Sequence, residues 1–232
     1  MELLYEGKAK RVYRTENEYV LLVKYKDEAT AFNAQKKAVI EGKGRLNNEI
    51  STILFTMLKK AGVDTHFIEK VSETEQLVRA VDIIPLEVIV RNVAAGSLSQ
   101  RLGLQEGRPL KQPVIEFCYK RDDLGDPLIT EAHIDLLELA TPEEVALIKQ
   151  SALKINDILS NYFDHLGILL VDFKLEFGRE KASGKVILAD EISPDTCRLW
   201  DKATGEKLDK DVFRKDLGDL QTAYAKILER LI

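Results

Sequence analysis

Apolar residues alternate with charged ones most clearly over residues 168–177, which predicts a strand with one core face and one chemical face. A second apolar run follows at residues 186–189, and the glycine-bearing segment 181–185 between the two runs predicts a β-hairpin. We expect the register that sets Glu176 opposite Asp190. The charged face of the hairpin then carries Asp172, Lys174, Glu176 and Asp190.

The same reading divides the rest of the chain into short strands and three long helices. Strand-like runs occupy residues 3–13, 19–25, 76–84, 86–91 and 114–119, with a loop expected at 108–113. Helical spacing of apolar residues predicts helices over residues 44–61, 142–166 and 211–231, and a short one at 98–102. The middle long helix starts with a capping box at Thr141 and ends at Gly167. No repeat or low-complexity linker appears, so we expect one two-lobed α+β enzyme.

Carboxylates crowded beside a lysine on one strand face indicate a cation site. Opposed like charges destabilise a sheet, and hard oxygen ligands suit Mg²⁺, especially one that substrate phosphates also hold. An ordinary solvated face with Lys–Glu pairs has the same pattern. The hairpin alone leaves both interpretations open.

The turn at Gly7, Lys8 and Lys10 is a candidate phosphate-binding loop. It lies between two short strand-like pieces, where backbone amides and two ammonium groups can cover a polyphosphate. It is not a P-loop, because the GxxxxGK[ST] pattern is absent. A basic hairpin tip without a ligand remains the alternative.

Three further positions offer anion or turn chemistry. The stretch from Arg91 to Ser97 places an arginine and a hydroxyl among small residues, which allows a ligand to approach the backbone closely. An arginine paired with a neighbouring glutamate explains that stretch equally well. Arg198, in the loop after Pro194, is a second candidate for binding an anion. Asp126 lies in a turn, and its carboxylate could equally serve only to stabilise that turn.

Composition narrows the function classes. The chain is 45% hydrophobic and 31% charged, as in ordinary globular proteins, and its net charge of −5 without a block of like charges argues against a nucleic-acid-binding surface. No apolar run reaches membrane-spanning length and no signal peptide is visible, so we expect a cytoplasmic protein without membrane contact. Cys118 and Cys197 are expected to be free thiols. The three histidines fall in no metal spacing, and we expect them at the surface or in caps.

Four motifs, YEGKAKRVY, VRNVAAGSL, LVDFKLEFG and DEISPDTCRLWD, resemble in this order the SAICAR synthetase family, phosphoribosylaminoimidazole-succinocarboxamide synthase of purine biosynthesis. The resemblance runs from Leu4 to the last helix. It implies a small antiparallel β lobe that binds ATP (residues 1–84), a larger α+β lobe (residues 85–232) and a nucleotide cleft between them, arranged as in protein kinases. It also implies an ATP-dependent ligase that joins 5-aminoimidazole-4-carboxylate ribotide (CAIR) to L-aspartate, giving SAICAR, ADP and phosphate, and we expect a homodimer.

The resemblance assigns roles to individual positions. The phosphate-covering loop of the family matches Gly7, Lys8 and Lys10. Its Mg²⁺-binding acids match Glu176 and Asp190. The residues that hold the ribotide and its phosphate match Arg91, Ser97 and Arg198. The expected catalytic set comprises Lys10, Asp126, Asp172 and Lys174.

The implied chemistry requires residues of these types. A carboxylate acylates poorly, so ATP first converts it to an acyl phosphate, which the aspartate amine displaces; positioning and charge neutralisation do most of the catalysis. Either Asp172 or Asp126 can accept the proton of the amine. Two rival functions are a kinase-like small-molecule phosphotransferase, although VAIK, HRD and DFG motifs are absent, and a non-catalytic metabolite-binding module.

Overall fold

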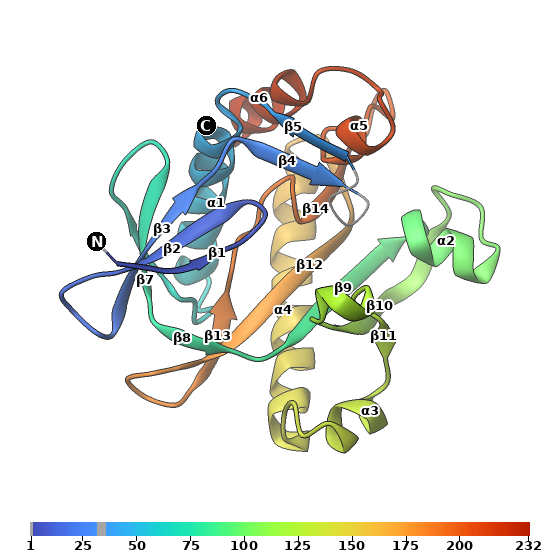
Figure 1. Ribbon diagram of the computed structural model, residues 1–232. Coiled ribbons are helices and arrows are strands. Elements are labelled where there is room, and N and C mark those ends of the chain that lie inside the picture. Colours follow the sequence, from blue (N-terminus) through green and yellow to red (C-terminus); the bar gives the residue numbers. More distant parts are fainter. Residues whose placement is uncertain (1, 32–35) are drawn as a thin grey trace.

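Antiparallel sheets form the framework of the computed structural model, which describes residues 2–31 and 36–232 (Figure 1). The first sheet has the order β1-β2-β3-β7-β6 and contains β1 (Leu3–Glu6), β2 (Lys10–Arg14), β3 (Val20–Tyr25), β6 (Phe67–Lys70) and β7 (Glu75–Arg79). The second sheet has the path β11-β10-β9-β12-β13, and β8 and β14 also pair with β12. Its strands are β8 (Val81–Ile83), β9 (Leu86–Val93), β10 (Pro109–Tyr119), β11 (Leu128–Ile129), β12 (Ile168–Glu180), β13 (Val186–Ala189) and β14 (Cys197–Asp201). A separate hairpin pairs β4 (Glu28–Ala31) with β5 (Lys36–Val39).

Three long helices cover the second sheet and the join between the sheets: α1 (Lys43–Lys60), α4 (Pro142–His165) and α6 (Leu220–Leu231). The shorter elements are α2 (Gly96–Leu102), η1 (Asp122–Leu124), α3 (Glu131–Leu136) and α5 (Asp211–Arg214). The start of α4 confirms the predicted capping box. The Thr141 hydroxyl accepts a hydrogen bond from the Glu144 backbone N–H at 3.2 Å, and the Glu144 carboxylate accepts one from the Thr141 N–H at 2.9 Å.

The main hydrophobic core lies where α1 and α4 pack on the second sheet. Leu54 of α1, Leu159 of α4 and Phe173 of β12 are fully buried members of this single cluster. Burying each such side chain contributes about 1.5–3 kcal/mol. A smaller cluster at Val23, Tyr25 and Val78 supports the first sheet. Because α1 contributes to the main core, the packing holds the two sheets in a fixed relation.

Strand β12 is the element that positions the candidate site. It pairs with β9 and β14 along its first half and with β13 and β8 along its second half. Phe173, Leu175 and Phe177 enter the main core, as the alternation predicted. Val171, expected on the same face, packs instead in a separate cluster with Val93 and Ala95, because the register shifts between Leu170 and Asp172. Its polar side chains at Asp172, Lys174 and Glu176 line two cavities on the opposite side.

The predicted register of the β12–β13 hairpin is wrong. Glu176 pairs with Ala189 rather than with Asp190. Asp190 follows the end of β13 and has a φ of 61°, a left-handed conformation that a non-glycine residue adopts at some energetic cost. Asp190 therefore reaches the site from a turn after the strand, although the hairpin itself and its 181–185 loop are confirmed.

Other predicted boundaries also differ from the structure. The C-terminal helix is interrupted, because Asp216 and Gly218 have positive φ between α5 and α6 and Asp219 caps α6. Leu217, which an unbroken helix over residues 211–231 would place on its apolar face, is 55% exposed. Residues 76–84 form two strands in different sheets, and residues 109–113 belong to β10 instead of a loop.

The mixed α+β architecture with two main antiparallel sheets confirms the predicted fold class. The lobe boundary between residues 84 and 85 stays a prediction. His66 was expected at the surface or in a cap, but it is buried against Phe55, with ring centroids 5.3 Å apart. No helix among the described ranges 2–31 and 36–232 is long and apolar enough to cross a membrane.

Candidate active site

Two adjoining cavities lie along the polar side of β9 and β12. The first has a volume of about 890 Å³ and is lined by the β1–β2 turn, the β4–β5 hairpin, Lys120 and Glu176. The second, of about 460 Å³, is lined from β9, α2, β12, β14 and α5. Glu87 and Asp126 border both cavities. Ligands in the two cavities would therefore meet at these two carboxylates.

The β1–β2 turn forms one wall of the first cavity. Gly7 and Lys8 line it, and the Gly7 N–H donates a hydrogen bond to the Lys10 carbonyl at 2.8 Å. The Lys8 ammonium crosses to the Asp122 carboxylate at 2.8 Å, and this hydrogen bond raises the pKa of Lys8. The turn thus presents an exposed cation to the cavity.

Lys10 is largely buried and joins the first sheet to the second. Its ammonium lies 2.5 Å from Asp190 Oδ1 and 3.0 Å from Glu191 Oε1, and its side chain is 14% exposed. Burial lowers the pKa of Lys10, but the negative charges of Asp190 and Glu191 outweigh it, so the pKa lies well above its ordinary value. The Ser193 hydroxyl donates to the second Glu191 oxygen at 2.5 Å and fixes that carboxylate.

Glu176 and Asp190 form an acidic pair beside Lys10. Burial and then the charge of Asp190 raise the pKa of Glu176 to about 7, despite an ion pair with Lys120 at 2.6 Å. Carboxylates that repel one another in a buried position favour a bound cation. In the part of the chain that the structure describes, no three His, Cys, Asp or Glu side chains are arranged to hold a metal ion. A cation here would rest on two carboxylates together with oxygens from a ligand.

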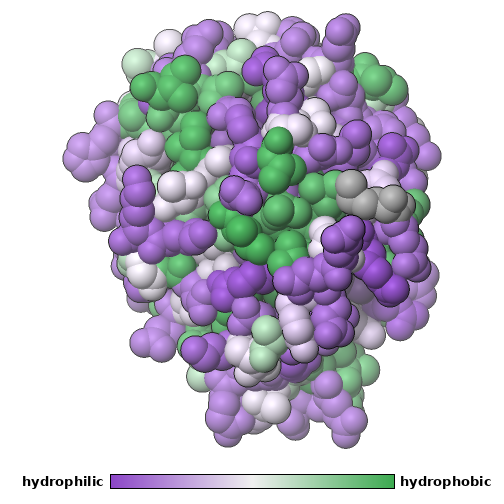
Figure 2. Space-filling view, turned by 90° about the vertical axis from the view of Figure 1, so that its left-hand side faces the viewer, coloured by the Kyte–Doolittle hydropathy of each residue, from purple (hydrophilic) through white to green (hydrophobic). Residues whose placement is uncertain are grey.

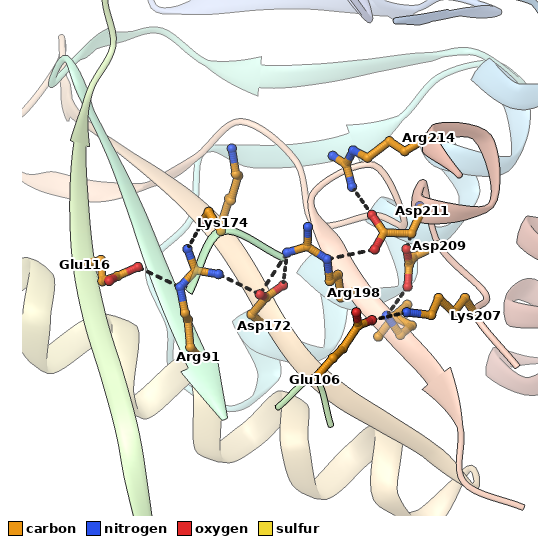
Figure 3. A network of polar contacts seen from close by, with 12 residues as sticks. Arg91, Glu106, Glu116, Asp172, Lys174, Arg198, Lys207, Asp209, Asp211 and Arg214 are labelled. Carbon is orange, nitrogen blue, oxygen red and sulfur yellow. Dashed lines mark hydrogen bonds and ion pairs between the residues drawn. The ribbon is translucent and has the colours of Figure 1, made fainter. Parts of the chain in front are cut away.

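The second cavity contains a carboxylate clamped by two arginines (Figure 3). Asp172 on β12 accepts from Arg91 Nη1 at 2.8 Å and from Arg198 Nη1 at 2.9 and 3.1 Å. Arg91 also donates to Ser97 Oγ at 3.0 Å and to Glu116 at 2.7 Å. The structure therefore contains the arginine–glutamate pair that the sequence allowed as an alternative to a ligand site. Arg91 nevertheless also lines the second cavity.

The missing side chain at Gly96 leaves room for the guanidinium group of Arg198. A methyl group at Gly96 would come within 2.5 Å of Arg198 Nη2, and the residue has a φ of 52°. The close approach expected for a ligand is made here by a guanidinium group of the protein. The absence of a side chain at Gly96 therefore fixes where the Arg198 fork points.

The structure brings the predicted site residues together in two groups. Gly7, Lys8 and Glu176 line the first cavity, with the Lys10–Asp190 ion pair beside them. The second cavity is lined by Arg91, Ser97, Asp126, Asp172, Lys174 and Arg198. Lys174 pairs with Glu87 at 2.7 Å. Asp126 accepts a hydrogen bond from the Arg121 backbone N–H at 2.9 Å, which is the turn-stabilising role that the sequence also allowed for it.

The site contains charged residues that the sequence analysis does not predict. Lys120, Glu87 and Asp211 each pair with a predicted site residue that is distant in the chain, so no local pattern marks them. Glu191 could have been found, because it follows Asp190 directly in an acidic pair ahead of Pro194.

Together these features define a two-lobed α+β protein with a two-chambered, charge-lined cleft. A family model described as SAICAR synthetase matches residues 3–231. The chain is 65% identical over 229 residues to phosphoribosylaminoimidazole-succinocarboxamide synthase of Anoxybacillus flavithermus, covering 99% of this chain and 95% of that relative. The chain therefore belongs to the SAICAR synthetase family and is a carbon–nitrogen ligase of purine biosynthesis.

Solved structures agree with this placement. The phosphoribosylaminoimidazole-succinocarboxamide synthase of Ehrlichia chaffeensis superposes with a TM-score of 0.97 at 48% identity, covering 99% of this chain and 98% of the other. A SAICAR synthetase in complex with ADP superposes with a TM-score of 0.95 at 50% identity, covering 98% of this chain and 96% of the other. The fold predicted from the motifs is thus confirmed.

The raised pKa of Glu176 predicts how stability depends on pH. Below pH 4.5 the carboxyl is protonated in both the folded and unfolded states; between 4.5 and about 7 only the unfolded state ionises, so stability falls as pH rises. Glu176→Gln removes this penalty, and we expect it to be more stable than the native protein at pH 8 by about 1 kcal/mol or more. Urea unfolding at several pH values, without metal or nucleotide, measures the difference.

The stability difference should shrink as the pH approaches 4.5. Glu229→Gln on exposed α6 is the matched control and should leave the stability nearly unchanged. A Glu176→Gln variant that is less stable than the native protein at pH 8 would show that the Lys120 ion pair, rather than burial, dominates at this position.

Proposed function

We propose that the protein joins CAIR to L-aspartate with hydrolysis of ATP to ADP and phosphate, giving SAICAR. The observation that carries this proposal is the pair of adjoining cavities, one beside a basic turn and paired acids, the other beside an arginine pair, which meet at Glu87 and Asp126. The ADP complex of a relative 50% identical to this chain supports ATP as the co-substrate.

ATP is assigned to the first cavity, with its phosphates toward the β1–β2 turn. Gly7 offers a turn without a side chain and Lys8 an ammonium group on the cavity wall. Lys10, at the end of the same turn, holds its ammonium on Asp190, close to Glu176 of that wall. Backbone amides and lysine point charges of this kind hold polyphosphates. Lys10 exchanges one of its two carboxylate partners for phosphate oxygen when the nucleotide binds.

Mg²⁺ fits Glu176 and Asp190. Both are carboxylates, both are largely buried, and the charge of Asp190 raises the pKa of Glu176. When bound there, Mg²⁺ would neutralise the negative charge that develops on the transferring phosphoryl group.

CAIR is assigned to the second cavity, with its phosphate toward Arg91, Ser97 and Arg198. Two planar guanidinium forks and a hydroxyl provide several directed donors to one phosphate. Both arginines already converge on Asp172, so they are pre-oriented before the ligand arrives. This places the imidazole carboxylate toward the residues shared with the first cavity.

The reaction proceeds in two displacements. A CAIR carboxylate oxygen attacks the terminal phosphorus of ATP; the new O–P bond forms as the bond to ADP breaks, which gives an acyl phosphate. The aspartate amine then attacks the acyl carbon, the C–N bond forms, and phosphate leaves with the electron pair of the broken C–O bond. Asp126 is the better placed proton acceptor, because both oxygens of Asp172 are engaged by arginine donors.

Lys174 completes the catalytic set at the junction. Its ammonium is held by Glu87, which borders both cavities, so the ammonium lies where the acyl phosphate would carry negative charge.

A homodimer and a cytoplasmic location are further expectations. Leu3 and Leu4 on the outer strand β1 are exposed apolar side chains that are compatible with subunit contact. Figure 2 shows an apolar patch in the middle of one largely polar face.

A coupled assay of ADP release tests the proposed function. We expect rapid release only when ATP, Mg²⁺, CAIR and L-aspartate are all present, because the second displacement regenerates the free enzyme. A kinase-like phosphotransferase would release ADP at the full rate with CAIR alone, and a binding module would release none. Either of these results would contradict the proposal.

Arg198→Lys tests the assignment of the second cavity. Lysine keeps the charge but loses the planar fork, so the KM for CAIR should rise about tenfold, equivalent to ~1.5 kcal/mol for a charge-assisted hydrogen bond. The KM for ATP should stay nearly unchanged. Arg45→Lys, at an exposed position of α1, serves as the control. A rise in the KM for ATP alone would move Arg198 to the nucleotide site.

A further inference from the structure

The two carboxylates that meet the Lys10 ammonium lie in different surroundings. Asp190 is 25% exposed in its side chain and belongs to a turn with left-handed φ, where its charge also acts on Glu176 of the first cavity. Glu191, the next residue in the chain, is only 3% exposed. Lys10 therefore has one carboxylate partner near the cavity wall and one in the interior.

Additional hydrogen bonds fix Glu191 but not Asp190. The buried Ser193 hydroxyl donates to Glu191 Oε2 at 2.5 Å, while Oε1 of the same carboxylate faces Lys10 at 3.0 Å. The Ser193 hydroxyl is itself oriented, because its oxygen accepts from the Asp195 backbone N–H at 3.1 Å. In residues 2–31 and 36–232, the Asp190 carboxylate has no hydrogen-bond donor other than Lys10. Asp190 is thus the partner that can be exchanged.

Tyr25 and Gln76 complete the interior side of the Lys10 site. Lys10 on β2 pairs directly with Tyr25 on β3, and its ammonium lies 5.7 Å from the centroid of the Tyr25 ring. The Gln76 amide donates to the Tyr25 hydroxyl at 3.1 Å, and both side chains are buried. A ligand can therefore reach the Lys10 ammonium without disturbing the core only from the Asp190 side.

We infer that Glu191 is a positioning residue, which holds the Lys10 ammonium in place while Asp190 yields its contact with Lys10 to nucleotide phosphate. The inference rests on the proposed function, in which Lys10 exchanges one carboxylate partner when ATP binds. Separating a buried carboxylate from its cation costs more than separating one that water reaches. Once released, the Asp190 carboxylate can act as a metal ligand beside Glu176.

Binding of ADP without metal, measured by calorimetry in the presence of a chelator, separates the roles of the two acids. Glu191→Gln removes the anion on the interior side, so Lys10 is drawn to Asp190 and the dissociation constant of ADP should rise about tenfold. Asp190→Asn removes the group that competes with phosphate, so the constant should stay unchanged or fall. With Mg²⁺ present, both variants should bind ADP more weakly than the native protein, because Asp190→Asn then lacks a metal ligand.

Ser193→Ala is a second and milder variant. It leaves the Glu191 charge in place but removes the hydroxyl that fixes it, so the dissociation constant of ADP without metal should rise about threefold. The truncation is small, so this variant should fold even if Glu191→Gln does not. Glu206→Gln is the matched control, because Glu206 pairs with Lys226 at 2.7 Å and lines neither cavity. It should leave ADP binding unchanged.

Two results overturn the inference. One is an ADP affinity without metal that is unchanged or higher in Glu191→Gln, or unchanged in Ser193→Ala, since a purely structural acid would alter only the free energy of unfolding. The other is a loss in Asp190→Asn without metal as large as that in Glu191→Gln. If the native protein releases no ADP in response to CAIR and L-aspartate, the proposed function fails by itself. The ADP titrations contain neither substrate and still decide the role of Glu191.

Discussion

The buried ion pairs of Lys10 are the interaction on which the candidate site depends. An ammonium taken out of water costs several kcal/mol unless it is paired and hydrogen-bonded. Here Asp190 and Glu191 both meet Lys10, at 2.5 and 3.0 Å. Because Lys10 lies on β2 and the two acids follow β13, this contact holds the first sheet against the second. The same contact places an ammonium group, which could bind nucleotide phosphate, next to a carboxylate, which could bind a metal ion.

The second cavity follows the same rule of shared charges. Asp172 forms ion pairs with Arg91 and Arg198. Asp211 forms ion pairs with Arg198, Arg214 and Lys215. Each acid orients several cations, so their N–H donors are held in fixed directions in a partly dehydrated setting where charged hydrogen bonds to a ligand are strong. Gly96 contributes by leaving room for the Arg198 fork.

Local patterns in the sequence predicted the parts of this arrangement that local physics determines. The alternation correctly separated the core face of β12 from its charged face over residues 172–177, but not at Val171, which the irregularity after Leu170 moves to a separate cluster. The capping box correctly started α4. The register of the β12–β13 hairpin was wrong because the left-handed turn at Asp190 overrides the strand periodicity on which the prediction relied. The partners of the site residues, such as Lys120 for Glu176 and Glu87 for Lys174, come from distant strands. They are set by the topology of the second sheet, which periodicity does not specify.

The central claim is that a phosphoryl group passes directly from ATP in the first cavity to the carboxylate of the ligand in the second. Transfer of oxygen from that carboxylate is the most direct test. With CAIR labelled by ¹⁸O in its carboxylate, one labelled oxygen should appear in the phosphate released at each turnover, because the bond broken in the second displacement joins the acyl carbon to that oxygen. Phosphate released without label, at a rate of SAICAR formation equal to that with unlabelled CAIR, would contradict the account.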